Sequence, residues 1–154
     1  MSFSGEVKEE LVRLENDARH CQIAELAVIL VYAGAIKTDA SGRPYIELQS
    51  DAPYVASRCG MLFDRLFHTA LPAGPNGSSL SLSKNDICVI KKALEAIKYK
   101  EGDRLVHPLV IKSLCCKRAF LRGAFLSAGS ISNPETGYHL EFVCSDAAQA
   151  EQLV

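Results

Sequence analysis

The hydrophobic positions of the chain recur first at helical and then at strand spacing. Residues 5–15 carry apolar side chains every three or four positions, which predicts an amphipathic helix that Ser4 can cap. Cys21–Ala33 is almost entirely apolar, which predicts a helix that is buried on most sides. Gly34 follows this segment and is placed to end the helix as its C′ residue.

A β-hairpin and a third helix are predicted next. The strands lie at 35–38 and 43–50, and the intervening Asp-Ala-Ser-Gly has the residues of a turn. In the second strand apolar and polar positions alternate, as in a half-buried strand with one open face. A helix over 53–68 follows, and its apolar side is formed by Val55, Cys59, Leu62, Phe63 and Leu66.

The middle of the chain is less regular. Residues 69–83 are rich in Gly, Pro and Ser and predict a turn between two weak strands, of which the second is Ser78–Ser83. Residues 85–100 carry apolar positions at helical spacing and predict a helix. Its lysines 91, 92, 98 and 100 indicate an exposed face.

An internal repeat joins the two halves of the chain. The segment Leu121–Gly129 has the same small-residue pattern as Leu26–Gly34, at an offset of 95 residues. The same offset pairs Gly42 with Gly137 and Ser-Asp-Ala at 50–52 with Ser-Asp-Ala at 145–147. The sequence therefore predicts an α+β fold of duplicated αββαββα repeats in which the second copy is incomplete.

This repeat gives the expected domain organisation. Residues 1–20 form an N-terminal helix, 21–100 the first repeat, 101–114 a connector, and 115–154 the start of a second repeat. We expect the chain to be a truncated piece. The missing half of repeat two would leave apolar surface and sheet edges uncovered, which favours self-association.

Composition narrows the function classes. The net charge is −1 and the pI is about 6.4, so no overall basic excess indicates nucleic-acid binding, although a local basic face fits within this total. No apolar run reaches the roughly 18 residues of a membrane span, and no signal peptide begins the chain. The six cysteines contain no CxxC pair, which predicts free thiols in a reducing cytoplasm.

No metal or cofactor site is expected from this sequence. The adjacent Cys115 and Cys116 are poorly spaced for zinc or for a disulfide and indicate packing instead of redox chemistry. The four histidines are far apart in the sequence, without the spacing of a nucleophile and its base, and they indicate surface or capping positions.

Two longer stretches carry a family resemblance. Helices that end in glycine and lead into hairpins resemble the LAGLIDADG homing-endonuclease fold. Ser2–Leu11 and Cys115–Val143 resemble the WhiA family of bacterial transcriptional regulators, which join a degenerate LAGLIDADG domain to a helix-turn-helix. The resemblance implies control of sporulation and cell division and a nucleoid-associated place in the cytoplasm. It also implies that the two motif helices cross closely through the small residues Ala27, Ala33, Gly34, Gly123, Ala124, Ala128 and Gly129.

The resemblance also implies where nuclease chemistry would reside. In nuclease relatives the residue before the last glycine of the motif is an acidic ligand of Mg²⁺. Here Ala33 and Ala128 occupy these positions, and a methyl group binds no cation. Asp39 and Glu135 lie in turns beyond the helices. We therefore expect no enzymatic activity.

DNA-binding members of this fold lay their β-surface along the duplex. Glu47 and Glu141 on this surface count against tight binding, and a solvated sheet face is the open alternative. Without a helix-turn-helix, we expect weak binding to double-stranded DNA, or else a protein-docking or dimerisation module. The residues that would face DNA are Lys37, Arg43, Tyr45, Gln49, Ser132 and His139.

Two arginines of the second motif helix have two open interpretations. Arg118 and Arg122 are neighbours at i and i+4. They are placed either to face phosphates or to pair with acids such as Glu25.

Overall fold

The computed structural model describes residues 3–14, 18–38, 40–42, 44–49, 53–68, 79–82, 87–100, 105–132, 135, 137, 139–144 and 147–154. Their helices are α1 (Phe3–Val12), α2 (Arg19–Val28), α3 (Pro53–Phe67), α4 (Ile87–Ala96), α5 (Leu114–Ala128) and α6 (Ala147–Leu153). A π-helical segment, Ile29–Ala33, continues α2, and a 3₁₀ helix, Pro108–Ile111, precedes α5. The strands are β1 (Gly34–Thr38), β2 (Pro44–Gln49), β3 (Ser79–Leu82), β4 (Gly129–Ile131) and β5 (Leu140–Phe142).

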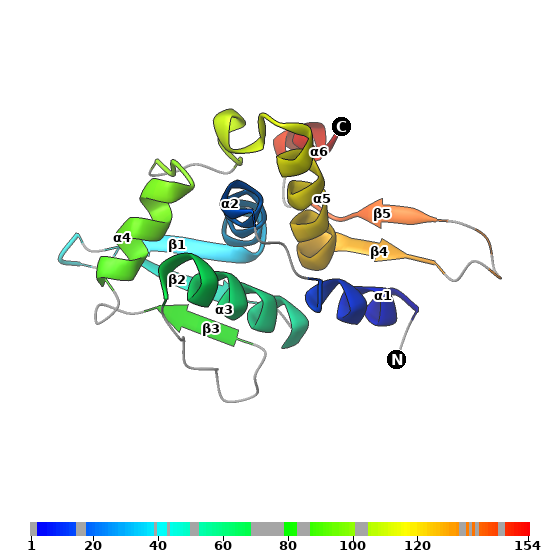
Figure 1. Cartoon of the computed structure of the whole chain (residues 1–154), viewed down its shortest axis with the longest axis horizontal. Helices are drawn as coiled ribbons and strands as arrows, with labels where there is room; N and C mark the ends of the chain where they lie inside the picture. Colours follow the sequence, from blue (N-terminus) through cyan, green and yellow to red (C-terminus); the bar gives the residue numbers. More distant parts are fainter. Residues whose placement is uncertain are drawn as a thin grey trace.

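The strands form two antiparallel sheets. One has the order β1-β2-β3, and the other pairs β4 with β5. Figure 1 shows the two sheets extending to opposite sides of the helices α2 and α5. Gly42 and Gly137, which the repeat pairs, have positive φ angles of 79° and 105°. The predicted α+β class, the first hairpin and the second hairpin are confirmed.

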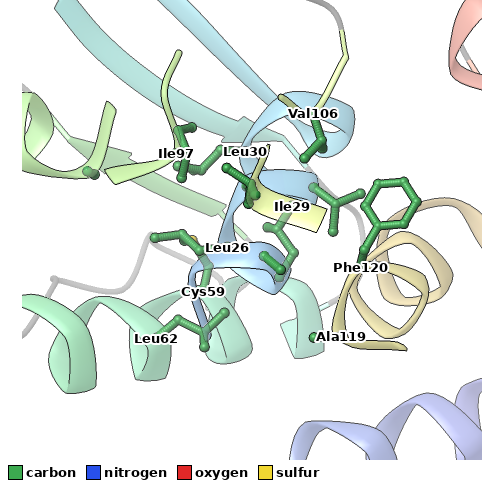
Figure 2. Close-up of a cluster of buried hydrophobic side chains, with 14 of the residues drawn as sticks. Leu26, Ile29, Leu30, Cys59, Leu62, Ile97, Val106, Ala119 and Phe120 are labelled. Atoms are coloured by element: carbon green, nitrogen blue, oxygen red, sulfur yellow. The ribbon is translucent and has the colours of Figure 1, made fainter. Parts of the chain in front are cut away.

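Helix α2 and its π-helical continuation are the centre of the core. Seven consecutive residues, 24–30, are buried, including Leu26, Ile29 and Leu30. Figure 2 shows these side chains between Cys59 and Leu62 of α3 and Phe120 of α5. The predicted apolar side of α3 is confirmed, since all five of its residues are buried.

The N-terminal helix differs from its prediction. It starts at Phe3, so Ser4 lies inside α1 and does not cap a helix that begins at Gly5. The Ser4 hydroxyl oxygen instead accepts a hydrogen bond from the backbone N–H of Ile131 in β4, at 3.3 Å. The Lys8 ammonium lies 5.5 Å from the centre of the Phe125 ring. Helix α1 therefore packs on the second repeat, although it precedes the first.

The end of the first motif helix also differs from its prediction. Residues 29–33 form a π-helical turn instead of continuing the α-helix to Ala33. Gly34 has φ −96° and ψ 163°, which is extended backbone and not the left-handed conformation of a C′ glycine. The reason is that the chain passes directly from the helix into β1.

The helix predicted over 85–100 is shorter in the structure. Helix α4 ends at Ala96, and Lys98 adopts a positive φ of 57°. Lys91 and Lys92 of the helix are exposed, and so are Lys98 and Lys100 beyond its end, as predicted. The predicted strand Ser78–Ser83 corresponds to β3, whereas the first weak strand and its turn lie outside the described residues.

A glutamine of α6 joins the second repeat to the connector. The side-chain amide of Gln152 donates to the Val106 carbonyl at 2.7 Å, and its oxygen accepts from the Val106 N–H at 3.0 Å. The Tyr32 hydroxyl donates to the same oxygen at 2.9 Å. Since Tyr32 belongs to repeat one, this contact holds α6 against both the connector and the first repeat.

Candidate functional site

The two motif helices approach closely around Gly123. A Cβ atom at this position would lie 2.4 Å from Cγ1 of Val28 and 3.0 Å from the carbonyl oxygen of Glu25. Ala27 and Ala124, which the sequence also assigned to this interface, are buried. Small side chains here let the two helix backbones come together.

Gly34 and Gly129 have a different role from the predicted one. A Cβ at Gly34 would lie 2.6 Å from the carbonyl oxygen of Leu30, and one at Gly129 would lie 2.3 Å from Cδ2 of Phe125. These neighbours belong to the helix that each glycine follows. The glycines therefore allow the sharp step from helix to strand in each repeat.

The positions of the nuclease ligands lie at the ends of the motif helices. Ala33 is the last residue of the π-helical segment, Ala128 is the last residue of α5, and both are half-buried. Neither methyl group can bind a cation or activate water. Glu135, which follows β4, is exposed, and Asp39 lies outside the described residues.

A buried ion pair lies beside this helix crossing. The Arg58 guanidinium donates to both carboxylate oxygens of Glu25, at 2.7 and 2.9 Å, and each side chain is 1% exposed. Arg58 also donates to the backbone carbonyls of Val12 and Leu14 at the end of α1. Arg122 places Nη1 3.6 Å from the Glu25 carboxylate. Of the two interpretations of Arg122, the structure favours pairing with Glu25.

The first predicted DNA-facing surface belongs to the β1–β2 hairpin. Lys37 of β1 and Tyr45 of β2 are register partners, and Gln49 is the last residue of β2. Ile46 alternates with these positions and is completely buried. The structure thus places positions 37, 45 and 49 on the two paired strands of this hairpin. Arg43 lies outside the described residues.

The second predicted DNA-facing surface belongs to the β4–β5 hairpin. His139 and Glu141 are both exposed, and the His139 Nε2 lies 2.9 Å from a Glu141 carboxylate oxygen. The Ser132 hydroxyl donates to the Gly137 carbonyl within the turn. This surface is open to solvent, but it carries the Glu141 carboxylate, which would repel DNA phosphates.

Four potential metal ligands that the sequence analysis treated separately converge at one point. The His20 Nδ1 lies 3.1 Å from the Cys116 Sγ, 3.4 Å from the Cys21 Sγ and 3.7 Å from the Cys115 Sγ. Among the described residues, this is the one group of three or more His, Cys, Asp or Glu side chains with metal-ligand spacing. Hydrogen bonding from the Ser113 hydroxyl, followed by contacts with Cys21 and Cys116, lowers the pKa of the Cys115 thiol.

Sequence reasoning missed this cluster, although a signal for it exists. The repeat offset of 95 residues pairs His20 with Cys115 and Cys21 with Cys116. The two pairs also occupy the same places in the first turns of α2 and α5. Superposing the repeats would have brought them together.

Comparison with known proteins gives consistent matches over the whole chain. The family model described as the WhiA LAGLIDADG-like domain matches residues 117–154. A protein of Lachnoclostridium phytofermentans named probable cell division protein WhiA is 36% identical over 99% of this chain and 53% of its own length. A protein of the same name from Lachnospira eligens is 34% identical over the full chain and 52% of its own length.

Two solved structures share the fold. Full-length DUF199/WhiA from Thermatoga maritima superposes with a TM-score of 0.66 at 22% identity, covering 99% of this chain and 48% of that protein. The N-terminal LAGLIDADG domain of DUF199/WhiA superposes with a TM-score of 0.59 at 24% identity, covering 99% of this chain and 72% of that one.

Two further facts bound the interpretation. The chain spans about half the length of the curated relatives it matches. In the part of the chain that the structure describes, no helix has both the length and the apolar character needed to cross a membrane. Taken with the identities above, the matches place this chain in the WhiA family, with the fold of its LAGLIDADG domain.

Proposed function

We propose that this chain is the non-catalytic LAGLIDADG part of a WhiA-type, DNA-binding transcriptional regulator that acts in bacterial cell division and sporulation, in the cytoplasm at the nucleoid. The relatives are named as probable cell division proteins, which supports the role in cell division. The chain's own part in this function is to present a weak DNA surface.

One arrangement carries the DNA proposal. The two hairpins extend to opposite sides of the crossed motif helices (Figure 1). The first hairpin carries positions 37, 45 and 49 on its paired strands, and the second hairpin exposes His139. Two such surfaces joined by one rigid helix pair can follow the backbone of a duplex on both sides of a central point.

The non-catalytic assignment is supported by residue identity. Hydrolysis of a phosphodiester in this fold needs carboxylates to hold Mg²⁺ at the ends of the motif helices. Ala33 and Ala128 end these helices here. A cleavage assay on duplex DNA with Mg²⁺ or Mn²⁺ tests this part, and nicking that depends on the protein and the metal would contradict it.

A salt series of DNA titrations tests the DNA surface. Each phosphate contact that is lost should reduce the slope of log K against log salt by about 1. We expect Lys37→Glu and Arg43→Glu to weaken binding to a short duplex and to flatten this slope. The matched control is Lys91→Glu, which makes the same charge change on an exposed face of α4. An equal effect of all three substitutions would mean that only the overall charge matters, and the sheet would be rejected as the DNA site.

A protein-docking or dimerisation module is the second candidate, and one observation favours it. Leu140 and Val143 at the β5 strand are 58% and 71% exposed, and Leu121 of α5 is 43% exposed. Apolar side chains of this size on an open hairpin indicate a covering partner. Light scattering across a concentration series distinguishes the candidates. A chain that self-associates but does not bind DNA would favour docking, provided that Leu140→Ser and Val143→Ser abolish the self-association.

A further inference from the structure

The cluster of His20, Cys21, Cys115 and Cys116 lies where the repeat symmetry brings the starts of the two motif helices together. His20 and Cys21 are the second and third residues of α2, and Cys115 and Cys116 are the second and third residues of α5. Each repeat therefore contributes an adjacent pair from the same turn of its helix. Residues about 95 positions apart in sequence reach one point by this arrangement.

The distances within the cluster match those between ligands around one metal ion. In a tetrahedral zinc site with Zn–S of about 2.3 Å and Zn–N of about 2.0–2.1 Å, sulfur and nitrogen are about 3.6 Å apart and two sulfurs about 3.8 Å apart. The three S···N distances here are 3.1, 3.4 and 3.7 Å, and all four ligand atoms lie within 4.8 Å of one another. A small movement of the side chains would bring all four onto one ion.

The electrostatic surroundings favour thiolates over thiols. The N-terminal ends of α2 and α5 both meet at the cluster, and helix N-termini stabilise negative charge. Lys98 and Lys112 line a hollow of about 740 Å³ that also reaches His20, Cys115 and Cys116. Three thiolates around a divalent cation carry a net charge of −1, which these groups offset.

The cluster is also accessible on one side. His20 and Cys115 are exposed, whereas Cys21 and Cys116 are buried. A metal ion can therefore enter from the hollow and reach the two buried sulfurs behind the exposed ligands. By contrast, the Cys59 thiol is surrounded by core residues and is 1% exposed.

We propose that His20, Cys21, Cys115 and Cys116 form a four-ligand site for one Zn²⁺ ion, with the His20 Nδ1 as the nitrogen ligand. Three sulfurs and one imidazole form the Cys₃His set of structural zinc sites, which are closed to substrate. The ion would join the beginnings of α2 and α5 across the repeat symmetry, and so fix the two repeats to one another independently of DNA binding. Binding releases the protons of the three thiols to the solvent and requires no oxidant or reductant.

Cobalt titration of the reduced full chain tests the site. Co²⁺ takes the place of Zn²⁺ and reports its ligands, since sulfur ligation gives an intense near-ultraviolet charge-transfer band and tetrahedral geometry gives strong visible bands. We expect one equivalent of Co²⁺ to bind with both signatures, and Zn²⁺ to displace it. Cys115→Ser and His20→Ala change exposed ligands, so both variants should fold. Each should lower the Co²⁺ affinity at least about 100-fold. Loss of a residue that only hydrogen-bonds to a ligand already costs about 10–100-fold, and loss of the ligand itself should cost more.

The matched control is Cys88→Ser, which removes an exposed thiol on α4 away from the cluster. It should bind Co²⁺ like the unsubstituted chain. Zn²⁺ should raise the melting temperatures of the unsubstituted chain and of Cys88→Ser, and it should leave the melting temperature of Cys115→Ser unchanged.

Three results would overturn the proposal. One is equal Co²⁺ affinity in the Cys115→Ser variant and the unsubstituted chain, and another is a spectrum without the sulfur charge-transfer band. The third concerns the chain isolated under argon. If it carries no zinc and its mass is lower than that of the reduced chain by two hydrogens, a disulfide occupies the cluster.

Discussion

The carboxylate of Glu25 and the guanidinium of Arg58 form two hydrogen bonds, at 2.7 and 2.9 Å, between side chains that are each 1% exposed. The pair joins α2 to α3, and Arg58 also donates to the carbonyls of Val12, the last residue of α1, and of Leu14 just beyond it. Three helices thus depend on one buried carboxylate. Such a pair is costly to break, because the remaining charge has no water to solvate it.

Replacing Glu25 with Gln should destabilise the fold strongly. The substitution leaves the Arg58 charge buried without its counter-ion, which typically costs about 3–5 kcal/mol. Urea denaturation measures this loss as a lower midpoint at an unchanged slope. Glu95→Gln on the exposed side of α4 is the matched control and should change the stability by less than about 0.5 kcal/mol. The double variant Glu25→Gln with Arg58→Met should recover part of the loss, and no recovery would contradict the ion-pair explanation.

Replacing Gly123 with Ala should also destabilise the fold, for a steric reason. The new methyl group would lie 2.4 Å from the Val28 side chain and would push α5 away from α2. Overpacking of this kind costs about 1–3 kcal/mol, more than the gain in helix propensity. Ser127→Ala in the same helix is the control. Its buried hydroxyl has no hydrogen-bond partner among the described residues, so its removal should be neutral or stabilising. A stabilised Gly123→Ala variant would mean that the helices are not in close contact.

Replacing Gln152 with Ala should loosen α6. The variant leaves the N–H and C=O of the buried Val106 without partners, at a cost of about 1–3 kcal/mol for each group. Hydrogen exchange should show faster exchange at Val106 and in α6, with little change in α3 and α4. Tyr32→Phe removes the hydroxyl bonds to the Gln152 side chain and the Gln149 carbonyl but keeps both bonds to Val106, so it should have a smaller effect. Uniform acceleration across the chain would show that α6 does not open separately.

Replacing Glu141 with Gln should strengthen DNA binding if the second hairpin faces the duplex. A carboxylate about 4 Å from a phosphate in water is repelled by about 1 kcal/mol, or about fivefold in affinity, and salt reduces this effect. Fluorescence anisotropy at low salt should therefore show about fivefold tighter binding. Glu151→Gln on α6 makes the same charge change at another exposed position. Equal gains for both variants would remove the support for DNA at this hairpin.

The buried Cys59 should make the fold sensitive to alkali. Burial raises the pKa of the Cys59 thiol to about 12 from 9.0. The folded state therefore holds the thiol proton more tightly than the unfolded state, and stability should fall as the pH rises from about 9 to about 12. Denaturation midpoints of Cys59→Ala should fall less over this pH range. An identical decline in both proteins would assign the alkaline sensitivity to other groups.

Local pattern was sufficient to predict most of the fold. The apolar side of α3 follows directly from helical spacing, and all five of its residues are buried. The turn glycines Gly42 and Gly137 were placed by the repeat, and both have positive φ. These features depend on a few neighbouring residues, which is why one sequence reveals them.

The predictions that failed depend on contacts between distant segments. The Ser4 hydroxyl contacts β4, more than a hundred residues away, and so does not cap its own helix. Gly34 is a local exception: a side chain there would meet the Leu30 carbonyl where the chain turns into β1, a constraint that hydrophobic spacing does not reveal. The His20–Cys116 contact joins residues 96 positions apart, and only the superposition of the two repeats brings them together in the sequence.

The π-helical segment Ile29–Ala33 has a consequence for the lost nuclease site. The two motif helices run over 15 residues each, 19–33 and 114–128, but the last turn of the first is wound more widely than that of the second. A π turn uses more residues to go once around the axis than an α turn does. Positions 33 and 128 therefore differ in angular phase around their helices. We therefore expect that restoring carboxylates at both positions would not by itself recreate a symmetric pair of metal ligands.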